Sequence, residues 1–311
     1  MPKHSQPRRG SLQYWPRKRA RKIIPSVNWK AVSGEGLLGF IVYKVGMGSA
    51  IVKDNTEHSL TKGQKITIPV TILEAPGLKI LSIRFYKHNK LVKEVFLASD
   101  KELKKKIKLG KKKEVKFDDF KDYTDIRIIA YSLANKTSIK KSPDIIELAL
   151  GGKKEEQLET AKKLINKEIS IDDFKVDLVD VRGVSKGKGT QGPVKRFGIS
   201  LRDHKSEKGV RKVGSIGPWH PARVTFRVPM AGQTGFFSRI HYNNQIVFIG
   251  KISDKDINKK SGFKRYGKIK TDYIILRGSV PGPIKRPLLI TAPLRKTKKQ
   301  DKKNFEFLSL K

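Results

Sequence analysis

The stretch KITIPVTILEAPGLKILSIRF, residues 65–85, decides the fold class of this sequence. It holds two runs rich in Ile, Val, Leu and Phe, separated by the turn-forming pair Pro76-Gly77. Two further runs of the same kind precede it, at residues 37–44 and 50–53. Short strands that follow one another across turns are typical of an all-β barrel or sandwich. The sequence therefore predicts a mainly β protein.

The strand pattern returns after a more varied middle part. In that middle part, Ser99 and Glu102 have the spacing of a capping box before a short helix. Residues 153–168 place four apolar side chains on one face of a helix. Helical and strand patterns mix only between about residues 81 and 170, so we expect an α/β insertion in an all-β domain. The predicted strands are residues 37–44, 50–53, 65–73, 78–85, 126–133, 144–150, 175–181, 222–228, 245–252, 273–276 and 288–291.

Positive charge is concentrated in a few segments of the chain. The 311 residues include 69 Lys and Arg against 29 Asp and Glu, a formal net charge of +40. Residues 1–30 carry +9, residues 182–239 carry +11 and residues 285–311 carry +7, whereas residues 81–180 carry only +6. Charge of this size makes an ordinary metabolic enzyme a poor first hypothesis and favours a polyanionic partner.

Arginine follows the same segments. Twelve of the 18 arginines lie in residues 1–30 and 182–239, where Gly and aromatic residues are mixed with them. Arg grips phosphate bidentately and stacks on bases, so these two segments favour nucleic-acid binding. The lysine runs at residues 104–113 and 296–303 lack interleaved aromatic residues. We interpret those runs as solvated faces or tails.

Residues 182–239 also have an unusual backbone composition. About forty residues between the strands predicted at 175–181 and 222–228 have no periodicity, and a loop of that length is usually functional or disordered. Ten of the 26 glycines lie in residues 182–239, and residues 211–224 read RKVGSIGPWHPARV. The two prolines stiffen the backbone around Trp219-His220. We therefore expect an exposed aromatic tip that stacks on or wedges between nucleotides, in preference to a buried tryptophan.

Motifs for catalysis or cofactor binding are unconvincing. Residues 187–192 match GxGxxG, but Pro193 follows and residues 194–201 show no helical face, so we reject a dinucleotide site. The six His lack metal-ligand spacing and there is no Cys, which leaves a zinc site little support. Charge balance and helix capping explain the acid pairs Asp118-Asp119 and Asp172-Asp173. We predict no enzyme activity, cofactor, metal ion or small-molecule substrate.

The N-terminus lacks the apolar stretch of a secretory signal. No apolar run approaches the roughly 20 residues that cross a bilayer, so we expect no membrane contact. The absence of Cys is compatible with a reducing compartment. We expect a cytoplasmic protein, free or held in an assembly.

Seven short motifs follow one another between residues 7 and 286. They are Pro7-Arg8-x-Gly10-Ser11-Leu12, Pro16-Arg17-Lys18-Arg19, Tyr43-Lys44-x-Gly46-Met47, Gly187-Lys188-Gly189, Trp219-His220-Pro221-Ala222-Arg223-Val224, Ala231-Gly232-Gln233-x-Gly235 and Gly278-x-x-x-Gly282-x-x-Lys285-Arg286. In their sequence and order they resemble the family of ribosomal protein three of the large subunit, in its archaeal and eukaryotic branch. Two positions depart from the family pattern: Glu207 stands where His is common, and Gly48 stands where Thr is frequent.

The resemblance implies a fold: a six-stranded barrel of the translation-protein type with an inserted α/β domain, an extended basic N-terminal arm and a long basic central loop. On this basis the arm comprises residues 1–36 and binds rRNA. The barrel comprises residues 37–80 and 171–292, and residues 182–239 contain the rRNA-penetrating loop. The inserted domain comprises residues 81–170, and residues 293–311 form a basic C-terminal tail.

The resemblance also implies a function. Members of the family are structural constituents of the large ribosomal subunit, bind its rRNA, contact neighbouring ribosomal proteins and support early assembly. Trp219 matches the tip of a finger near the peptidyl transferase centre, on the aminoacyl-tRNA side, and residues 196–212 match a basic limb beside it. The candidate rRNA-binding residues are Arg8, Arg9, Trp15, Arg17, Lys18, Arg19, Arg21, Lys22, Lys186, Lys188, Lys195, Arg196, Arg202, Lys205, Lys208, Arg211, Lys212, Trp219, His220, Arg223, Arg227, Gln233, Arg239, Lys285 and Arg286.

Two other classes of protein share some of these features. A chromatin-like protein that coats RNA or DNA would carry the same charge but would not need a stiff aromatic tip. An RNA-modifying enzyme would need a cleft with perturbed acids or a metal site, and the sequence shows neither.

Overall fold

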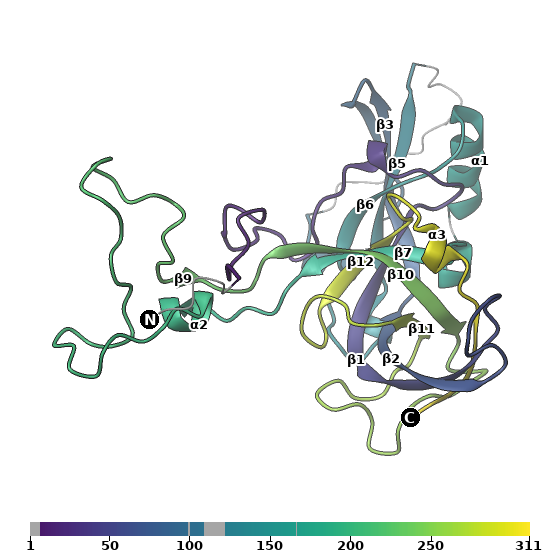
Figure 1. Ribbon diagram of the computed structural model, residues 1–311. Coiled ribbons are helices and arrows are strands. Elements are labelled where there is room, and N and C mark those ends of the chain that lie inside the picture. Colours follow the sequence, from purple (N-terminus) through teal and green to yellow (C-terminus); the bar gives the residue numbers. More distant parts are fainter. Residues whose placement is uncertain (1–6, 99, 109–121, 166) are drawn as a thin grey trace. The chain divides into compact units, whose positions relative to one another are not determined.

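The computed structural model describes residues 7–98, 100–108, 122–165 and 167–311, and the chain divides into two compact units (Figure 1). The smaller unit combines the N-terminal residues up to Arg21 with Val184–Ser238. The larger unit combines Lys22–Gly183 with Arg239–Lys311. The N-terminal arm and the central loop, which are far apart in sequence, therefore belong to the same unit.

The main sheet has seven strands in the order β12-β7-β10-β11-β2-β1-β13. An additional pairing between β1 and β12 closes six of them into a ring, and β13 lies outside the ring beside β1. The long strand β1 pairs with two strands along the same edge: its residues 39–43 pair with β12, and its residues 50–54 pair with β13. The strands are β1 (Gly39–Asp54), β2 (Lys65–Ala75), β7 (Leu178–Val184), β10 (Ser238–Gly250), β11 (Asp272–Arg277), β12 (Pro287–Thr291) and β13 (Phe305–Leu310).

A second sheet, with strand order β4-β3-β5-β6, lies in the segment predicted as an insertion. Helix α1 (Lys154–Leu164) packs on β5 and buries Ala161 and Leu164. Strands and a helix therefore both occur in the segment for which a mixed pattern was predicted, residues 81–170. The strands of this sheet are β3 (Leu78–Lys87), β4 (Lys90–Phe96), β5 (Asp125–Ser132) and β6 (Ile145–Ala149).

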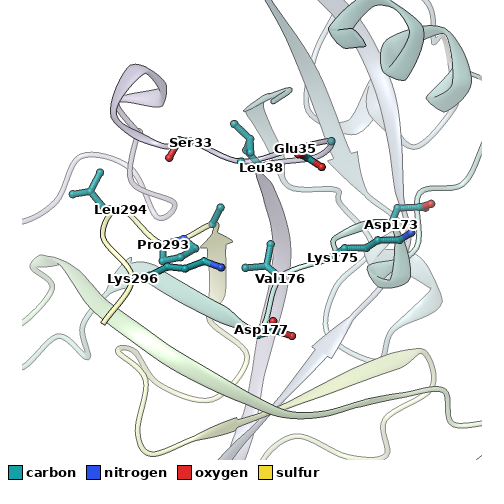
Figure 2. Close-up of a pocket in the computed structure, with 13 residues that line it drawn as sticks. Ser33, Glu35, Leu38, Asp173, Lys175, Val176, Asp177, Pro293, Leu294 and Lys296 are labelled. Atoms are coloured by element: carbon teal, nitrogen blue, oxygen red, sulfur yellow. The ribbon is translucent and has the colours of Figure 1, made fainter. Parts of the chain in front are cut away.

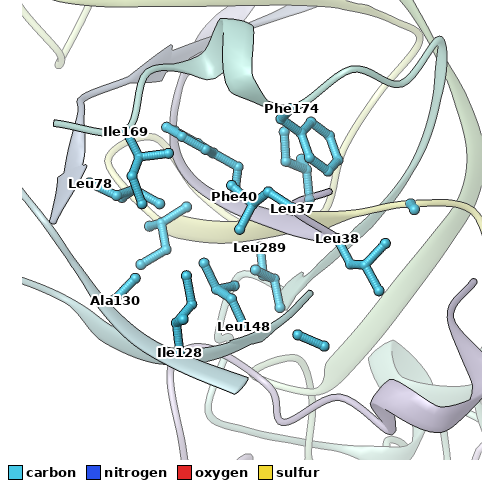
Figure 3. Close-up of a cluster of buried hydrophobic side chains, with 14 of the residues drawn as sticks. Leu37, Leu38, Phe40, Leu78, Ile128, Ala130, Leu148, Ile169, Phe174 and Leu289 are labelled. Atoms are coloured by element: carbon cyan, nitrogen blue, oxygen red, sulfur yellow. The ribbon is translucent and has the colours of Figure 1, made fainter. Parts of the chain in front are cut away.

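One hydrophobic cluster joins the ring to the second sheet (Figure 3). Phe40 of β1 and Leu289 of β12 meet Ile128 of β5 and Leu148 of β6, and all four side chains are fully buried. The buried hydroxyl of Tyr43 on β1 donates to the Asp144 carboxylate at 2.7 Å. Burial raises the pKa of Tyr43, so the phenol stays a neutral donor across this contact. The apolar run at residues 37–44 is therefore explained by burial on both faces of the sheet.

The last part of the predicted arm packs on this core. Trp29 is 4% exposed and starts a short 3₁₀ helix, η1 (Trp29–Ala31). Val32 is buried with it, and Ile24 and Val27 are partly buried against the same cluster. The extended character predicted for residues 1–36 therefore fails for residues 24–32, because these apolar side chains have a core to enter.

Most predicted strands are confirmed, but their boundaries changed. Residues 37–44 and 50–53 form one strand, since Gly46 lies at a register shift of β1 instead of ending it. Gly in a strand often marks such a bulge. The strand predicted at 222–228 was wrong: this stretch has no strand and is almost entirely exposed. It has the sequence ARVTFRV, and its residues pair with no strand of the described chain.

Other elements were missed or shortened. Strands β4 and β13 were not predicted, because Lys and Glu interrupt the apolar residues of β4, and Glu and Ser interrupt those of β13. Helix α1 is shorter than the predicted 153–168, as Ile165 has an extended backbone. Near the predicted capping box there is only a 3₁₀ turn, η2 (Leu103–Lys105), and Ser99 lies outside the described residues. Part of the 104–113 lysine run and the pair Asp118-Asp119 also lie outside them.

Candidate nucleic-acid interface

The smaller unit is built mostly from irregular backbone. Its regular elements are the two-residue strands β8 (Thr190–Gln191) and β9 (Gly232–Gln233), which pair with each other, and the helix α2 (Pro193–Phe197). The sequence prediction of no helix after Gly192 was wrong, because Pro193 occupies the first helical turn, where a missing N–H costs nothing. Yet β8 pairs antiparallel with β9, so these glycines do not belong to a parallel βαβ unit, and a dinucleotide site stays unsupported.

An aromatic and cationic stack holds the arm on the central loop. The guanidinium carbon of Arg17 lies 5.2 Å from the ring centroid of Trp15 and 4.8 Å from that of Phe197. Trp15 also contacts Phe226, with 5.2 Å between ring centroids. Gly10 has a φ of +77°, and a Cβ there would lie 2.6 Å from the Phe197 ring. A glycine is therefore required where the arm passes Phe197.

Hydrogen bonds reinforce this packing. The Ala20 N–H donates to the Phe236 carbonyl at 2.9 Å, and Arg8 Nη2 donates to the Arg227 carbonyl at 3.0 Å. Arg196 Nη1 donates to the Met230 carbonyl at 2.9 Å, and Arg17 Nη2 donates to the Ser11 carbonyl at 2.8 Å. Each of these arginines donates one N–H to a backbone carbonyl. A guanidinium has five N–H donors, so each retains donors for an acceptor that does not belong to this chain.

The Phe197→Ala variant is expected to loosen the arm from the loop, because Phe197 is 6% exposed and faces both Gly10 and Arg17. Amide hydrogen exchange at Ala20, whose N–H is bonded to Phe236, should accelerate by at least about tenfold. The matched control is Leu201→Ala in the same unit, where the side chain is 55% exposed and exchange at Ala20 should not change. Equal exchange rates in Phe197→Ala and the wild type would contradict the packing role.

Positive charge in this unit is not neutralised within the chain. Its described residues include 17 Lys and Arg, six from the arm and eleven from the loop, against the acids Asp203 and Glu207. Among those described residues, no Lys or Arg forms an ion pair with a carboxylate, and the pair that occurs joins Asp203 to His204. Burial, and then the neighbouring Arg196 and Arg8, lower the pKa of Arg17. Cations are thus held close together without counter-charges.

The inserted segment shows the opposite arrangement. Its arginines, Arg84 and Arg127, both bind carboxylates: Arg84 pairs with Glu94 at 3.0 Å, and Arg127 pairs with Asp125 at 2.9 Å. Both also approach Glu147, at 3.6 and 3.7 Å. The arginines of the two parts of the chain therefore have different surroundings. Arginines of the second sheet face carboxylates, whereas those of the smaller unit face outward or towards carbonyls.

Trp219 is 88% exposed, and the residues on either side of it are exposed too. The prediction that this tryptophan lies outside the core is confirmed.

Gln233 is held within the chain: its Nε2 donates to the carbonyls of Thr234 and Gly235, at 3.3 and 2.9 Å. It stabilises the turn after β9, where a Cβ on Gly235 would meet the Lys186 carbonyl at 2.1 Å.

Four candidate residues belong to the larger unit instead: Lys22, Arg239, Lys285 and Arg286. Two of them are held by Lys44, which the sequence reasoning included in a motif but not among the site residues. The buried Lys44 Nζ donates to the carbonyls of Val280 and Gly282, at 2.7 and 3.1 Å. Its backbone bonds both Lys285 and Arg286. Two motifs far apart in sequence therefore meet, and Lys44 orients the cationic pair.

The remaining candidate residues lie in the smaller unit, whose arm and loop the structure brings together. They are Arg8, Arg9, Trp15, Arg17, Lys18, Arg19, Arg21, Lys186, Lys188, Lys195, Arg196, Arg202, Lys205, Lys208, Arg211, Lys212, Trp219, His220, Arg223, Arg227 and Gln233. Sequence reasoning missed Phe197 and Phe226, which hold the arm in place. In the sequence, the only sign of this role is that each of these aromatic residues is adjacent to an arginine, Arg196 or Arg227.

The larger unit contains a cavity of about 670 Å³ (Figure 2). Glu35, Asp173 and Asp177 line it. Asp173 is engaged elsewhere: it accepts from the Ser170 N–H at 3.0 Å and from Lys167 Nζ at 2.9 Å. The neighbouring Asp172 pairs with Lys251 at 3.2 Å. Helix capping and charge balance, as predicted, explain this acid pair.

The described part of the chain offers no other sign of a metal or membrane site. Within it, no three His, Asp or Glu side chains come close enough to hold a metal ion. No helix of the described residues is long and apolar enough to span a bilayer.

Comparison with known proteins identifies what this chain resembles. The profile of the family described as "Ribosomal protein L3" matches residues 1–309. The "Large ribosomal subunit protein uL3" of Methanocaldococcus jannaschii is 42% identical over 309 residues, covering 94% of this chain and 92% of the relative. The protein of the same description from Methanothermobacter thermautotrophicus is 38% identical over 327 residues, covering 97% and 95%. That from Methanosphaera stadtmanae is 39% identical over 320 residues, covering 96% and 95%.

Proposed function

The chain belongs to the ribosomal protein L3 family, whose members are structural proteins of the large ribosomal subunit and not enzymes. On this basis we propose that it binds large-subunit rRNA through its smaller unit. The observation that carries the proposal is the set of 17 described Lys and Arg without a carboxylate partner in that unit. Phosphate groups would supply the missing counter-charge. Most of the candidate residues named above would act there, as positioning contacts to the RNA backbone.

The exposed Trp219 supports a second part of the proposal. Trp219 and His220 form the tip of a finger that buttresses the region of the peptidyl transferase centre, on the aminoacyl-tRNA side. A tryptophan that is 88% exposed has its ring free to stack on a base. The basic limb beside it comprises residues 196–212, in which Glu207 replaces a common histidine. That replacement removes a cation or a stacking surface from the limb.

The domain organisation fits this function. We propose that the ring of six strands is the translation-protein-type barrel, formed by residues 37–80 and 171–292, and that residues 81–170 are the inserted domain. The closure of the ring by β1 and β12 supports the first part. The separate sheet and α1 support the second. The arm lies within residues 1–36, of which 24–32 pack on the core, and the C-terminal residues 293–311 include β13, which joins the main sheet. Neighbouring ribosomal proteins would pack on the remaining surface.

Sedimentation of a cell lysate tests this function. We expect the protein to co-migrate with large subunits at one copy per subunit and to stay there after a high-salt wash. An arm and a loop enclosed by folded rRNA would dissociate slowly, even though high salt weakens each phosphate contact. Release by the wash, or a spread over all RNA and DNA in the gradient, would instead support a general nucleic-acid-coating protein.

A further inference from the structure

The lysine-rich stretch near the C-terminus is anchored on the larger unit. Residues 297–305, here named the C-terminal strap, include α3 (Lys298–Asp301) and lead into β13, which pairs with β1 from Asp54 to Ala50. The Asn55 N–H donates to the Asn304 carbonyl at 2.9 Å, and Gln245 Nε2 donates to the Lys303 carbonyl at 2.6 Å. This lysine run is therefore a solvated face, as one of the two sequence interpretations had it, and not a free tail.

The strap brings lysines next to an arginine of the ring. Its start is fixed by Asn243 Nδ2 of β10, which donates to Thr297 Oγ1 at 2.9 Å. Near its end, the Phe305 ring lies 5.1 Å from the guanidinium carbon of Arg277, at the end of β11. The pKa of Lys303 is lowered by burial and then by the nearby Arg277 and Lys299. Lys299 lies in α3, the Lys303 N–H donates to the Gln300 carbonyl at 3.2 Å, and Phe305, two residues later, contacts Arg277. The strap therefore brings Lys299 and Lys303 near Arg277 at the end of β11.

Nearby carboxylate charge offsets this group only in part. Asp54 is close enough to raise the pKa of Lys303, but it forms no ion pair with that lysine: its oxygens accept from the Thr56 N–H at 2.9 Å and from the Thr61 hydroxyl at 2.6 Å. Among the described residues, Arg277, Lys299 and Lys303 form no ion pair with Asp or Glu. Like charges held together cost free energy unless an anion joins them.

We propose that Arg277, Lys299 and Lys303 form a further binding site for the phosphate backbone of RNA, built entirely on the larger unit. The inference rests on the proposed rRNA-binding function and adds a contact outside the arm and the loop. Arg277 has one face on Phe305, so its N–H groups remain in plane to grip a phosphate. The anchored strap presents its lysines in a preset arrangement, which reduces the ordering cost of binding.

Filter binding of the full-length protein to large-subunit rRNA over a series of KCl concentrations tests the site. In the variant Arg277→Gln, Lys299→Gln, Lys303→Gln, we expect the slope of log affinity against log salt to fall by about 2–3, as for three lost phosphate contacts. The matched control is Lys259→Gln, Lys260→Gln, Lys264→Gln, which removes the same charge from exposed lysines of the larger unit. The control slope should remain near that of the wild type.

Other outcomes separate this inference from the proposed function. If both triple variants lost the same amount of slope, the effect would come from net charge alone, and the proposed site would be overturned. An unchanged slope in the site variant, with a flattened slope when residues 1–21 are removed, would overturn the site alone. If the wild type did not bind rRNA, both proposals would fail. The double variant Lys299→Gln, Lys303→Gln keeps the Arg277 contact with Phe305 and should lose about two thirds of the same effect if folding of the triple variant is impaired.

Discussion

Removal of residues 1–21 is expected to flatten the salt dependence of rRNA binding strongly. The segment carries seven Lys and Arg and no acid. Each lost phosphate contact lowers the slope of log affinity against log salt by about 0.7–0.9, so the slope should fall by up to about 5–6. The measurement is filter binding to large-subunit rRNA across KCl concentrations. The deletion ends at Arg21 because a cut after residue 30 would remove Trp29, which is 4% exposed in the core.

A charge-only variant controls for the loss of packing in this deletion. Arg9→Gln, Lys18→Gln, Arg19→Gln, Arg21→Gln keeps Trp15 and Arg17, which contact Phe226 and Phe197. It should retain the protected Ala20 amide and still lose about 3–4 of the slope. If neither the deletion nor this variant changed the salt dependence, the arm would not contact phosphate, and the proposed role of the smaller unit would have to be abandoned.

The tryptophans at positions 29 and 219 are expected to respond in opposite ways to truncation. Trp29→Ala should lower the free energy of unfolding by about 3–5 kcal/mol, because a large buried side chain leaves a cavity. Trp219→Ala should change it by less than about 0.5 kcal/mol, because the side chain is 88% exposed and removes no core contact. Thermal unfolding of the two purified variants measures the difference.

Cells that depend on each variant supply the second measurement. Trp219→Ala should allow normal accumulation of the protein but impair subunit maturation or translation, since its ring would be missing from the finger tip. Trp219→Phe retains an aromatic face and should restore part of that activity. A large drop in the unfolding temperature of Trp219→Ala would instead place the side chain in a core, contrary to its exposure. Normal translation in cells with Trp219→Ala would contradict the proposed role of the Trp219 tip in the function of the subunit.

Local sequence signals predicted the elements that depend on nearby residues. The strands at residues 65–73 and 78–85 could be predicted because their apolar runs and the turn between them are contiguous. β13 could not, since Glu306 and Ser309 interrupt its apolar residues, and only its pairing with β1 makes it a strand. The stretch at 222–228 shows the reverse case. Its composition favours a strand, but no neighbour offers the hydrogen bonds that a strand needs.

Composition and motif order alone determined that this is a mainly β, highly basic protein whose arginines are collected in an arm and a loop. Those properties are written in neighbouring residues and need no folded partner. Only the tertiary structure decided which cations remain without a carboxylate: Arg84 and Arg127 have one, whereas Arg17 and Arg277 have aromatic rings instead. The physical reason is that an ion pair or a ring contact depends on distance in space. Residues such as Arg277 and Phe305 come within 5.1 Å only when the chain has folded.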